Sequence, residues 1–347
     1  MNILYITKLR DSEACGVTNA VLQLLDAIRD CATVSWLDIS GNTFTIEKNI
    51  RRININDIND IELDVAVFED PFNSLTFCKI ASILSKRNIP YIICPHGSFH
   101  RVALKHHAVK KYVAINTVFR VFLKNCLACQ FLTSNESLQS LKFNKSIIIP
   151  NGINNTKYRI RNKCTNVVFV GRKDVKTKGI DLLIQACALS KDLLRKENIT
   201  LTIYGSHETI KDDEYIRNAI SSNDLQDIVI EKGPVFGLEK EKVLLEADAY
   251  IQTSRNEGFP MSILEALSYG LPCIVTYSTN LGEMIENNEC GWAVSLDSAQ
   301  IANAITNLVE DTKLQSKSAN AVALANRFQW KDIAMQTIEE YGKLLYR

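Results

Sequence analysis

The stretch that decides the fold is SRNEGFPMSILEALSYG, residues 254–270, which carries two glutamates, Glu257 and Glu265, eight positions apart. Apolar residues recur at helical spacing after Pro260, which suits a first helical turn because it has no N–H to lose there. Gly270 is a typical helix stop. The pattern therefore predicts a helix with Glu257 on the loop before it and Glu265 about two turns further on.

The backbone amides at the start of this helix, around Gly258 and Phe259, are expected to lack helical partners. Together with the helix dipole they form a site for an anion. Carboxylates beside an anion site are expected only if the ligand also has hydroxyl groups to donate. A nucleotide diphosphate sugar has both, with phosphates for the helix end and hydroxyls for the glutamates.

The composition is that of an ordinary globular protein of two domains, with 347 residues, 46% hydrophobic and 23% charged. A net charge of +1 provides no general attraction to nucleic acid, and we expect no nucleic-acid partner. Ten cysteines are scattered along the chain, and the close pair Cys126 and Cys129 has no second pair to complete a zinc site. Reduced thiols and a cytoplasmic location are expected.

Neither a secretory signal nor a membrane span is expected. The apolar run near the N-terminus, residues 3–6, is too short for a signal peptide. No apolar run approaches the roughly 18 residues of a transmembrane helix. We expect a cytoplasmic protein that is at most peripheral at the inner face of the cell membrane.

Short apolar runs alternate with helical patterns throughout the chain. In the first half, strands are expected at 3–6, 33–39, 64–68, 91–94, 127–133 and 146–149, and helices at 17–28 and 72–85. In the second half, strands are expected at 167–170, 201–204, 228–230, 249–253, 273–276 and 292–294, and helices at 180–190, 215–222, 239–246 and 298–308. This alternation predicts parallel sheets with helices on both faces.

The turn signal at residues 150–152, Pro-Asn-Gly, separates the two series. We expect an α/β protein with a Rossmann-like domain at 1–155 and a second at 156–329, facing each other across a deep cleft. The amphipathic segment 330–347 is expected to return to the first domain. In such sheets ligands bind at the carboxyl ends of the strands.

A cationic loop follows the strand at 167–170. It contains Gly171, Arg172 and Lys178 and leads into a helix. Charge alone is equally typical of a solvated surface loop. Its place at the carboxyl end of a strand, in the same half as Glu257 and Glu265, instead favours a clamp for a diphosphate whose cations also offset those carboxylates.

Together these motifs resemble glycosyltransferase family 4, whose members have the GT-B fold. The resemblance covers essentially the whole chain and is strongest from 165 to 276. The Glu-x7-Glu spacing in this setting is its most specific feature. The motifs are FVGR (169–172), KG (178–179), YG (204–205), ADA (247–249), EGFP (257–260), EA (265–266) and GLPCIV (270–275).

The resemblance implies retaining transfer from a nucleotide sugar without a metal or other cofactor, and the sequence has no Asp-x-Asp pair. It implies that Glu257 contacts the hydroxyls of the donor sugar, that Glu265 binds the ribose, and that Arg172 and Lys178 hold the diphosphate. The remaining donor-binding positions it implies are Gly16, Gly171, Gly205, Val235, Phe236, Gly258, Phe259 and Pro260.

In the first half of the chain, the resemblance implies roles for Gly16 and His96. Gly16 matches a glycine-rich loop that lets the backbone approach the phosphates, although Cys15 stands where a second glycine is usual. His96, in Pro-His-Gly at a strand end, resembles a catalytic histidine that faces the donor sugar. A lone histidine is more often structural, but its strand-end place favours a functional role.

Residues 99–124 contain no acidic residue. They include three histidines, several aromatic residues, and the cations Arg101, Lys105, Lys110, Lys111, Arg120 and Lys124. A basic helical region with an apolar face suits the surface of an anionic membrane, and a solvated basic helix is the alternative. Resemblance to enzymes that act on lipid-linked glycans favours membrane contact.

The expected function is transfer of a hexose-type sugar from a UDP- or GDP-linked donor to a growing, lipid-linked glycan of a bacterial O-antigen or capsule. The alternatives are a soluble transferase with a small acceptor and a catalytically silent scaffold that binds nucleotide sugars. A dinucleotide-dependent oxidoreductase is disfavoured because Gly-x-Gly-x-x-Gly is missing.

Overall fold

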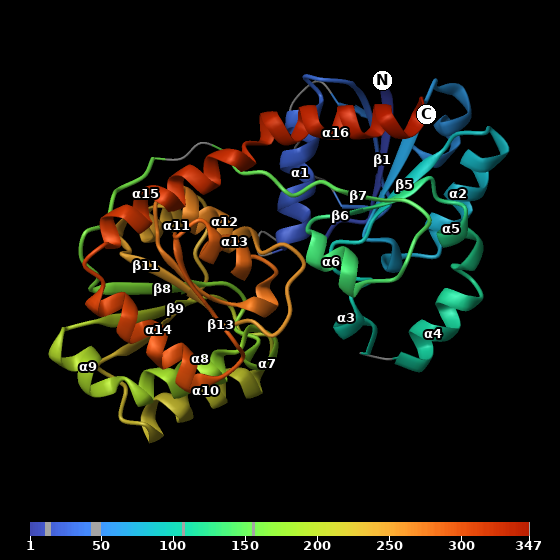
Figure 1. The fold of residues 1–347 in the computed structure, drawn as a ribbon. Helices are drawn as coiled ribbons and strands as arrows, with labels where there is room; N and C mark the ends of the chain where they lie inside the picture. Colours follow the sequence, from blue (N-terminus) through green and yellow to red (C-terminus); the bar gives the residue numbers. More distant parts are fainter. Residues whose placement is uncertain (11–14, 43–49, 106–107, 155–156, 347) are drawn as a thin grey trace. The chain divides into compact units, whose positions relative to one another are not determined.

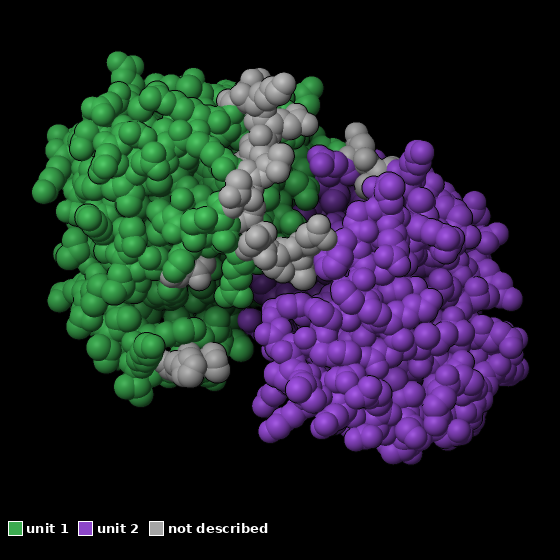
Figure 2. Space-filling model, turned by 180° about the vertical axis from the view of Figure 1, so that it is seen from behind, with its two compact units in different colours: residues 1–152, 328–347 green, residues 153–327 purple. Residues whose placement is uncertain are grey.

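The computed structural model describes residues 1–10, 15–42, 50–105, 108–154 and 157–346. The chain forms two compact units, coloured green and purple in Figure 2. Unit 1 consists of Met1–Gly152 and Phe328–Arg347, and unit 2 of Ile153–Arg327. The chain therefore leaves unit 1 at the Pro-Asn-Gly turn and returns to it with its last helix.

Unit 1 is a parallel sheet of seven strands in the order β3-β2-β1-β4-β5-β6-β7. Helices cover both faces of this sheet (Figure 1). The strands are β1 (Asn2–Thr7), β2 (Thr33–Asp38), β3 (Arg51–Arg52), β4 (Val65–Glu69), β5 (Tyr91–Cys94), β6 (Ala128–Phe131) and β7 (Ser146–Ile148). The helices are α1 (Gly16–Ile28), α2 (Thr76–Lys86), α3 (Arg101–Lys105), α4 (Ala108–Asn116), α5 (Arg120–Lys124), α6 (Ser134–Gln139) and α16 (Trp330–Leu345).

The last helix, α16, packs beside α1 (Figure 1). Trp330 donates its ring N–H to Oε1 of Gln23 at 2.7 Å, and the Tyr341 hydroxyl donates to Oε1 of Gln130 at 2.7 Å. The Trp330 ring also covers Gly152, where an added Cβ would lie 2.5 Å from it. Only a glycine fits under this ring, so the end of the first series and the return of the chain are packed together.

Unit 2 is a parallel sheet of six strands in the order β10-β9-β8-β11-β12-β13. The strands are β8 (Asn166–Val170), β9 (Thr200–Tyr204), β10 (Val229–Lys232), β11 (Ala249–Gln252), β12 (Cys273–Thr276) and β13 (Gly291–Val294). The helices are α7 (Val175–Lys178), α8 (Ile180–Leu189), α9 (Lys191–Lys196), α10 (Ile210–Ser222), α11 (Gly237–Glu246), α12 (Met261–Ser268), α13 (Gly282–Asn287), α14 (Ser298–Glu310) and α15 (Leu314–Ala325).

The buried guanidinium of Arg161 joins two helices of unit 2, although sequence patterns did not point to it. Its Nη2 donates to the carbonyl oxygens of Leu244 and Leu245 near the end of α11, at 2.9 and 3.1 Å. Its Nη1 donates to the carbonyl of Tyr269 at the end of α12. The last carbonyls of a helix have no partner within it, so Arg161 satisfies groups that burial would otherwise leave unpaired.

Three segments differ in detail from the expected elements. The predicted helix 72–85 begins only at Thr76, because Pro71–Asn73 forms a separate 3₁₀ turn. Residues 99–124 contain three short helices, α3, α4 and α5. Pro260 precedes the first residue of α12 rather than lying in its first turn, since its ψ of 100° is extended.

Candidate functional site

The loops expected to bind a ligand in unit 2 lie at one edge of its sheet. All six strands are parallel, so the segments that follow β8 and β11 leave the same edge. Connections from β8 run to one side through β9 and β10, whereas β11, β12 and β13 lie on the other side. The site therefore lies at the point where the strand order reverses, which is the usual ligand position in such sheets.

The carboxylate of Glu257 is the centre of a polar network at this point. Its Oε1 accepts hydrogen bonds from Lys178 Nζ at 2.6 Å, Ser254 Oγ at 2.6 Å and Gln252 Nε2 at 2.8 Å. Gln252 is in turn oriented by the hydroxyl of Ser262, which donates to its Oε1 at 2.8 Å. The sequence analysis identified Lys178 and Glu257 but missed the neutral residues that orient them.

Lys178 reaches this carboxylate because α7 ends there. The following residue, Gly179, has a φ of +67°, and an added Cβ would lie 2.0 Å from the carbonyl oxygen of Thr253. A side chain at this position would therefore collide with the strand end that leads to Glu257. The glycine allows the loop after β8 to lie directly against the loop after β11.

The loop that carries Glu257 and Gly258 is held from a third segment. Asn280, whose φ is +66°, donates its side-chain N–H groups to the carbonyls of Glu257 at 2.6 Å and Gly258 at 3.1 Å. The amide of Glu257 donates to the carbonyl of Ser278 at 3.3 Å. Phe259 is buried. Hydrogen bonds to its backbone therefore fix the loop before α12 without a bound ligand.

Arg172 is placed differently from expectation. Its Nη1 lies 2.5 Å from Oε2 of Glu208, and both side chains are about half exposed. The expectation that Arg172 and Lys178 together offset both glutamates is therefore wrong for this conformation: Lys178 pairs with Glu257, while Lys240 Nζ lies 2.8 Å from Oε1 of Glu265. The partner on α11 could not be foreseen because 25 positions separate Lys240 from Glu265.

The neighbouring cation, Lys173, is buried. Its Nζ lies 2.8 Å from Oε1 of Glu231, which also contacts Nε2 of His207. Burial raises the pKa of Glu231, but hydrogen bonds from Lys173 and His207 outweigh burial and hold its pKa below the usual value. This network holds the loop after β8 through the buried side chain of Lys173, whereas the side chain of Arg172 in the same loop is exposed to solvent.

The glycines of this region allow two loops to touch. An added Cβ on Gly205, whose φ is +155°, would lie 1.8 Å from the carbonyl oxygen of Gly171. The two loops after β8 and β9 thus meet backbone to backbone. Val235 is buried and Phe236 is partly exposed, and both follow β10 at the same edge of the sheet.

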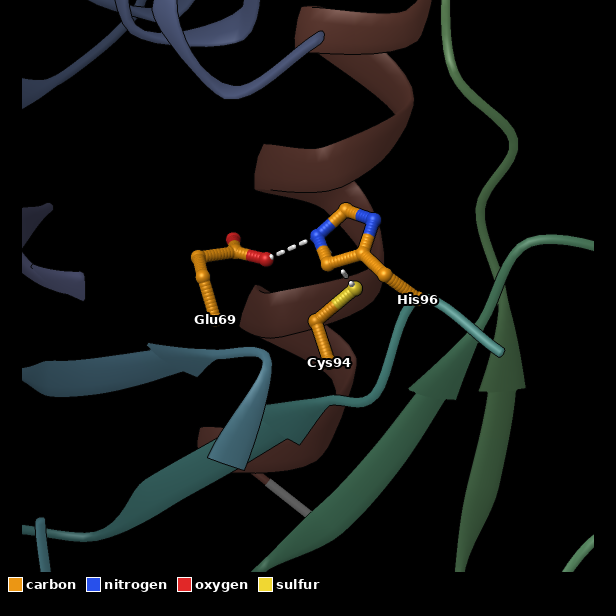
Figure 3. Close-up of side chains that lie close together, drawn as sticks. All are labelled: Glu69, Cys94 and His96. Carbon is orange, nitrogen blue, oxygen red and sulfur yellow. Dashed lines mark hydrogen bonds and ion pairs between the residues drawn. The ribbon is translucent and has the colours of Figure 1, made fainter. Parts of the chain in front are cut away.

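Unit 1 holds the remaining predicted residues. Gly16 is the first residue of α1, and an added Cβ there would meet nothing within 4 Å among the described atoms. His96 follows β5, and its side chain is nearly covered, with its Nε2 2.5 Å from Oε2 of Glu69 (Figure 3). The sequence analysis missed Glu69, which lies at the carboxyl end of the neighbouring strand β4.

Two groups among the described residues contain side chains of metal-binding type, Glu69/Cys94/His96 and His207/Asp213/Glu231. In the first, the 2.5 Å between His96 Nε2 and Glu69 Oε2 is a hydrogen-bond distance, whereas two ligands of one tetrahedral zinc ion lie about 3.3 Å apart. In the second, the ammonium of Lys173 already contacts Glu231 and would repel a cation. In this structure the side chains of both groups are engaged in contacts with one another or with Lys173.

Comparison with known structures agrees with this architecture. The structure of Anabaena Alr3699/HepE in complex with UDP superposes with a TM-score of 0.76 at 17% identity, over 99% of this chain and 100% of that one. This similarity and the two parallel sheets define a two-domain α/β protein of the GT-B fold.

The sequence places the second unit in a family. Residues 153–323 match the family described as glycosyl transferases group 1, so unit 2 carries a domain of that family. D-inositol 3-phosphate glycosyltransferase of Arthrobacter sp. (strain FB24) is 28% identical over 178 residues, which are 51% of this chain and 42% of that protein. The chain thus spans less than half the length of that curated relative.

A second curated relative aligns over more of the chain. GDP-mannose:cellobiosyl-diphosphopolyprenol alpha-mannosyltransferase of Xanthomonas oryzae pv. oryzae (strain PXO99A) is 23% identical over 269 residues. The alignment covers 74% of this chain and 68% of that protein. The matching family and both relatives are glycosyltransferases by name.

Proposed function

We propose that this protein is a retaining glycosyltransferase of family 4 that moves a hexose-type sugar from a nucleotide diphosphate sugar to an acceptor hydroxyl. The observation that carries the proposal is the contact between Lys178 and Glu257 where the strand order of a group 1 domain reverses. A cation and a hydroxyl-accepting carboxylate at one point match a ligand that has both a diphosphate and a sugar.

Four of the predicted residues have direct parts in the proposed mechanism. Lys178 and Arg172 hold the diphosphate and stabilise the charge that grows on it as the glycosidic bond breaks, with the amides before α12 contributing. Glu257 orients the sugar hydroxyls and Glu265 the ribose. The acceptor hydroxyl attacks the donor sugar from the same face from which the diphosphate departs. The proton of this hydroxyl passes to the phosphate oxygen that leaves.

In this mechanism the charge on the diphosphate is offset by protein cations, and no protein side chain forms a covalent intermediate. Loss of one phosphate-holding cation is expected to cost about 3 kcal/mol of barrier, or ~10²-fold in rate. The donor is proposed to be UDP- or GDP-linked, in line with the Anabaena complex with UDP and with the relative named for GDP-mannose.

We further propose a lipid-linked glycan as the acceptor and peripheral contact with an anionic membrane through residues 99–124. Neither α3 nor α4 has a buried residue. Large apolar side chains are exposed there, between the cations: Val102, Val109, Tyr112, Val113, Val118 and Val121. Such a mixture of exposed apolar and basic side chains suits an anionic bilayer surface.

No helix among the described residues is long and apolar enough to cross a bilayer. Flotation with neutral and anionic liposomes tests the proposed contact. The wild type is expected to float only with anionic lipid, and a Val109→Asp, Tyr112→Asp variant is expected to remain at the bottom. Equal flotation with both kinds of vesicle, or with none, would contradict this part of the proposal.

The donor is tested by thermal unfolding with UDP, GDP, ADP and TDP and their sugars, because a ligand that binds the native state raises its melting temperature. Hydrolysis of the stabilising donor then separates an enzyme from a silent scaffold that only binds it. Transfer to a small sugar or alcohol as efficiently as to a polyprenol-linked glycan would favour a soluble transferase. No stabilisation by any of these compounds would contradict the function proposed.

A further inference from the structure

The turn that carries His96 is unusual in its backbone. The amide of Ser98 donates to the carbonyl of Pro95 at 2.9 Å, and the two residues between them, His96 and Gly97, have φ values of +47° and +82°. A positive φ is unstrained for glycine and uncommon, although tolerated, for a histidine. Contacts around the turn stabilise His96 in this conformation.

One carboxylate holds the backbone of the turn. Glu136, which is fully buried at the start of α6, accepts the amide of Gly97 on Oε1 at 2.7 Å. Its other oxygen accepts the amide of Leu132 at 2.8 Å. The turn after β5 is thereby tied to the segment after β6, and the contact leaves the imidazole of His96 to a different partner.

That partner is Glu69. It ends β4 opposite Cys94 in the register of β4 and β5, so the side chains of Glu69 and Cys94 leave the sheet on the same face. His96 Nε2 lies 2.5 Å from Glu69 Oε2 and 3.6 Å from Cys94 Sγ. In Figure 3 the other ring nitrogen, Nδ1, points away from both. The side chains of His96 and Glu69 are only 6% and 2% exposed.

We infer that Glu69 is a positioning residue that engages Nε2 of His96 and keeps the ring an imidazolium, so that Nδ1–H is a charged donor for the ligand. The inference rests on the function proposed above, where that ligand is the phosphate-linked sugar. A buried carboxylate at this distance is compensated when its partner carries a positive charge, and it would be costly beside a neutral ring.

The surroundings of His96 favour the same protonation state. Burial lowers the pKa of His96, but Glu69, through its charge and its hydrogen bond, together with Asp70 and Glu136, raises the pKa above 6.5 overall. The other titratable groups close to this cluster stay neutral, because burial raises the pKa of Cys94, Tyr5 and Tyr341 well above their ordinary values. The groups that face the imidazole are thus carboxylates and neutral groups.

The pair can be tested without any donor. In protein with ¹⁵N-labelled histidine, NMR titration is expected to show both ring nitrogens of His96 protonated at pH 6.5, with the signal assigned by its loss in His96→Gln. In Glu69→Gln the imidazole is expected to become neutral at this pH. A neutral His96 in the wild type would overturn the inference even if Glu69→Gln were poorly folded, and so would an unchanged titration in a folded Glu69→Gln.

The consequence for the ligand is tested by a double-mutant cycle on turnover of the stabilising donor. Because Glu69 acts through His96, Glu69→Gln is expected to lower kcat by ~10-fold and to shift the pH profile. In a protein that already carries His96→Gln, the additional change Glu69→Gln should cause no further loss of kcat. Additive losses would make Glu69 merely structural. If no donor binds the wild type, the proposed function fails, while the NMR result still decides the state of the pair.

Discussion

The ammonium of Lys178 lies 2.6 Å from Oε1 of Glu257, although 79 positions separate the two residues in the chain. Ser254 and Gln252 donate to the same oxygen. Oε2 therefore keeps its lone pairs for a ligand hydroxyl, as far as contacts with the described residues go. A phosphate that enters beside this pair would compete for Lys178, which links the position of the cation to the presence of the donor.

Replacement of the site cations should lower turnover. Lys178→Ala and Arg172→Ala are each expected to reduce kcat by ~10²-fold, because charge growing on the leaving diphosphate would lose its partner. Donor hydrolysis or transfer under saturating donor measures this effect. Lys176→Ala is a matched control, since Lys176 is an exposed cation in the same short helix. Turnover within a few-fold of the wild type in both site variants would make the assignment wrong.

Replacement of Glu265 should weaken binding of the nucleotide. Hydrogen bonds to a charged group contribute about 1.5–3 kcal/mol, so Glu265→Gln is expected to raise the Kd for the donor by roughly 10- to 100-fold. Isothermal titration with the stabilising nucleotide measures Kd. Lys242→Ala on α11 provides the control, because Lys242 is 73% exposed and its ion-pair partner among the described residues is the exposed Glu246. An unchanged Kd in Glu265→Gln would remove the ribose contact from the proposal.

Loss of Arg161 should destabilise unit 2. Arg161→Leu removes the side-chain donor of the carbonyls of Leu244, Leu245 and Tyr269, and we expect a loss of roughly 3–5 kcal/mol in the free energy of unfolding. Arg217→Ala is the comparison, because Arg217 is 63% exposed and its i,i+4 ion pair with Asp213 is expected to contribute at most about 1 kcal/mol. Urea unfolding measures both, and equal losses would contradict the role given to Arg161.

Because the loops after β8 and β9 are in close contact, replacement by alanine should destabilise the protein at Gly205 but not at Gly233. Gly205→Ala would place a Cβ 1.8 Å from the carbonyl oxygen of Gly171 and is expected to displace the loop that carries Arg172. A lower melting temperature and weaker donor binding should follow. Gly233→Ala, where an added Cβ meets nothing within 4 Å among the described atoms, should retain the melting temperature. Similar behaviour of the two variants would argue against this contact.

The ion pair between His96 and Glu69 predicts a dependence of stability on pH. The pKa of His96 is raised in the folded state, so its contribution is complete below the ordinary value of 6.5 and is lost as pH rises through the folded value. The free energy of unfolding of the wild type, relative to His96→Gln, should fall over that range. A difference that stays constant, or grows, with rising pH would contradict a raised pKa.

Local patterns predicted most of the fold. Buried parallel strands are continuous apolar runs, and β4 and β5 were recognisable for this reason. Residues 72–75 show the limit of such patterns, because the sequence predicted a helix from 72 whereas a 3₁₀ turn occupies Pro71–Asn73 and α2 begins only at Thr76.

The candidate site was predictable in part. Glu257, Glu265 and Lys178 belong to motifs with fixed spacing, and their chemistry follows from residue type. Partners such as Lys240, Asn280 and Glu69 have no such signal, since each lies on a different element from the residue that it contacts. Arg172 has the expected charge, but its partner in this conformation is Glu208.

The sequence by itself determined which residues are candidates for the chemistry, because the pair of glutamates, the cationic loop and the Pro-His-Gly turn are local patterns. Only the tertiary structure decided how these groups are paired: Lys178 with Glu257, Lys240 with Glu265, and Glu69 with His96. The physical reason is that residues far apart in the chain meet only when strands and helices pack together. Lys178 and Glu257 follow the neighbouring strands β8 and β11, Glu69 and His96 lie at the ends of β4 and β5, and Lys240 and Glu265 lie on α11 and α12. The distances between these paired groups influence their charge and protonation. The spacing of the residues in the sequence does not encode those distances.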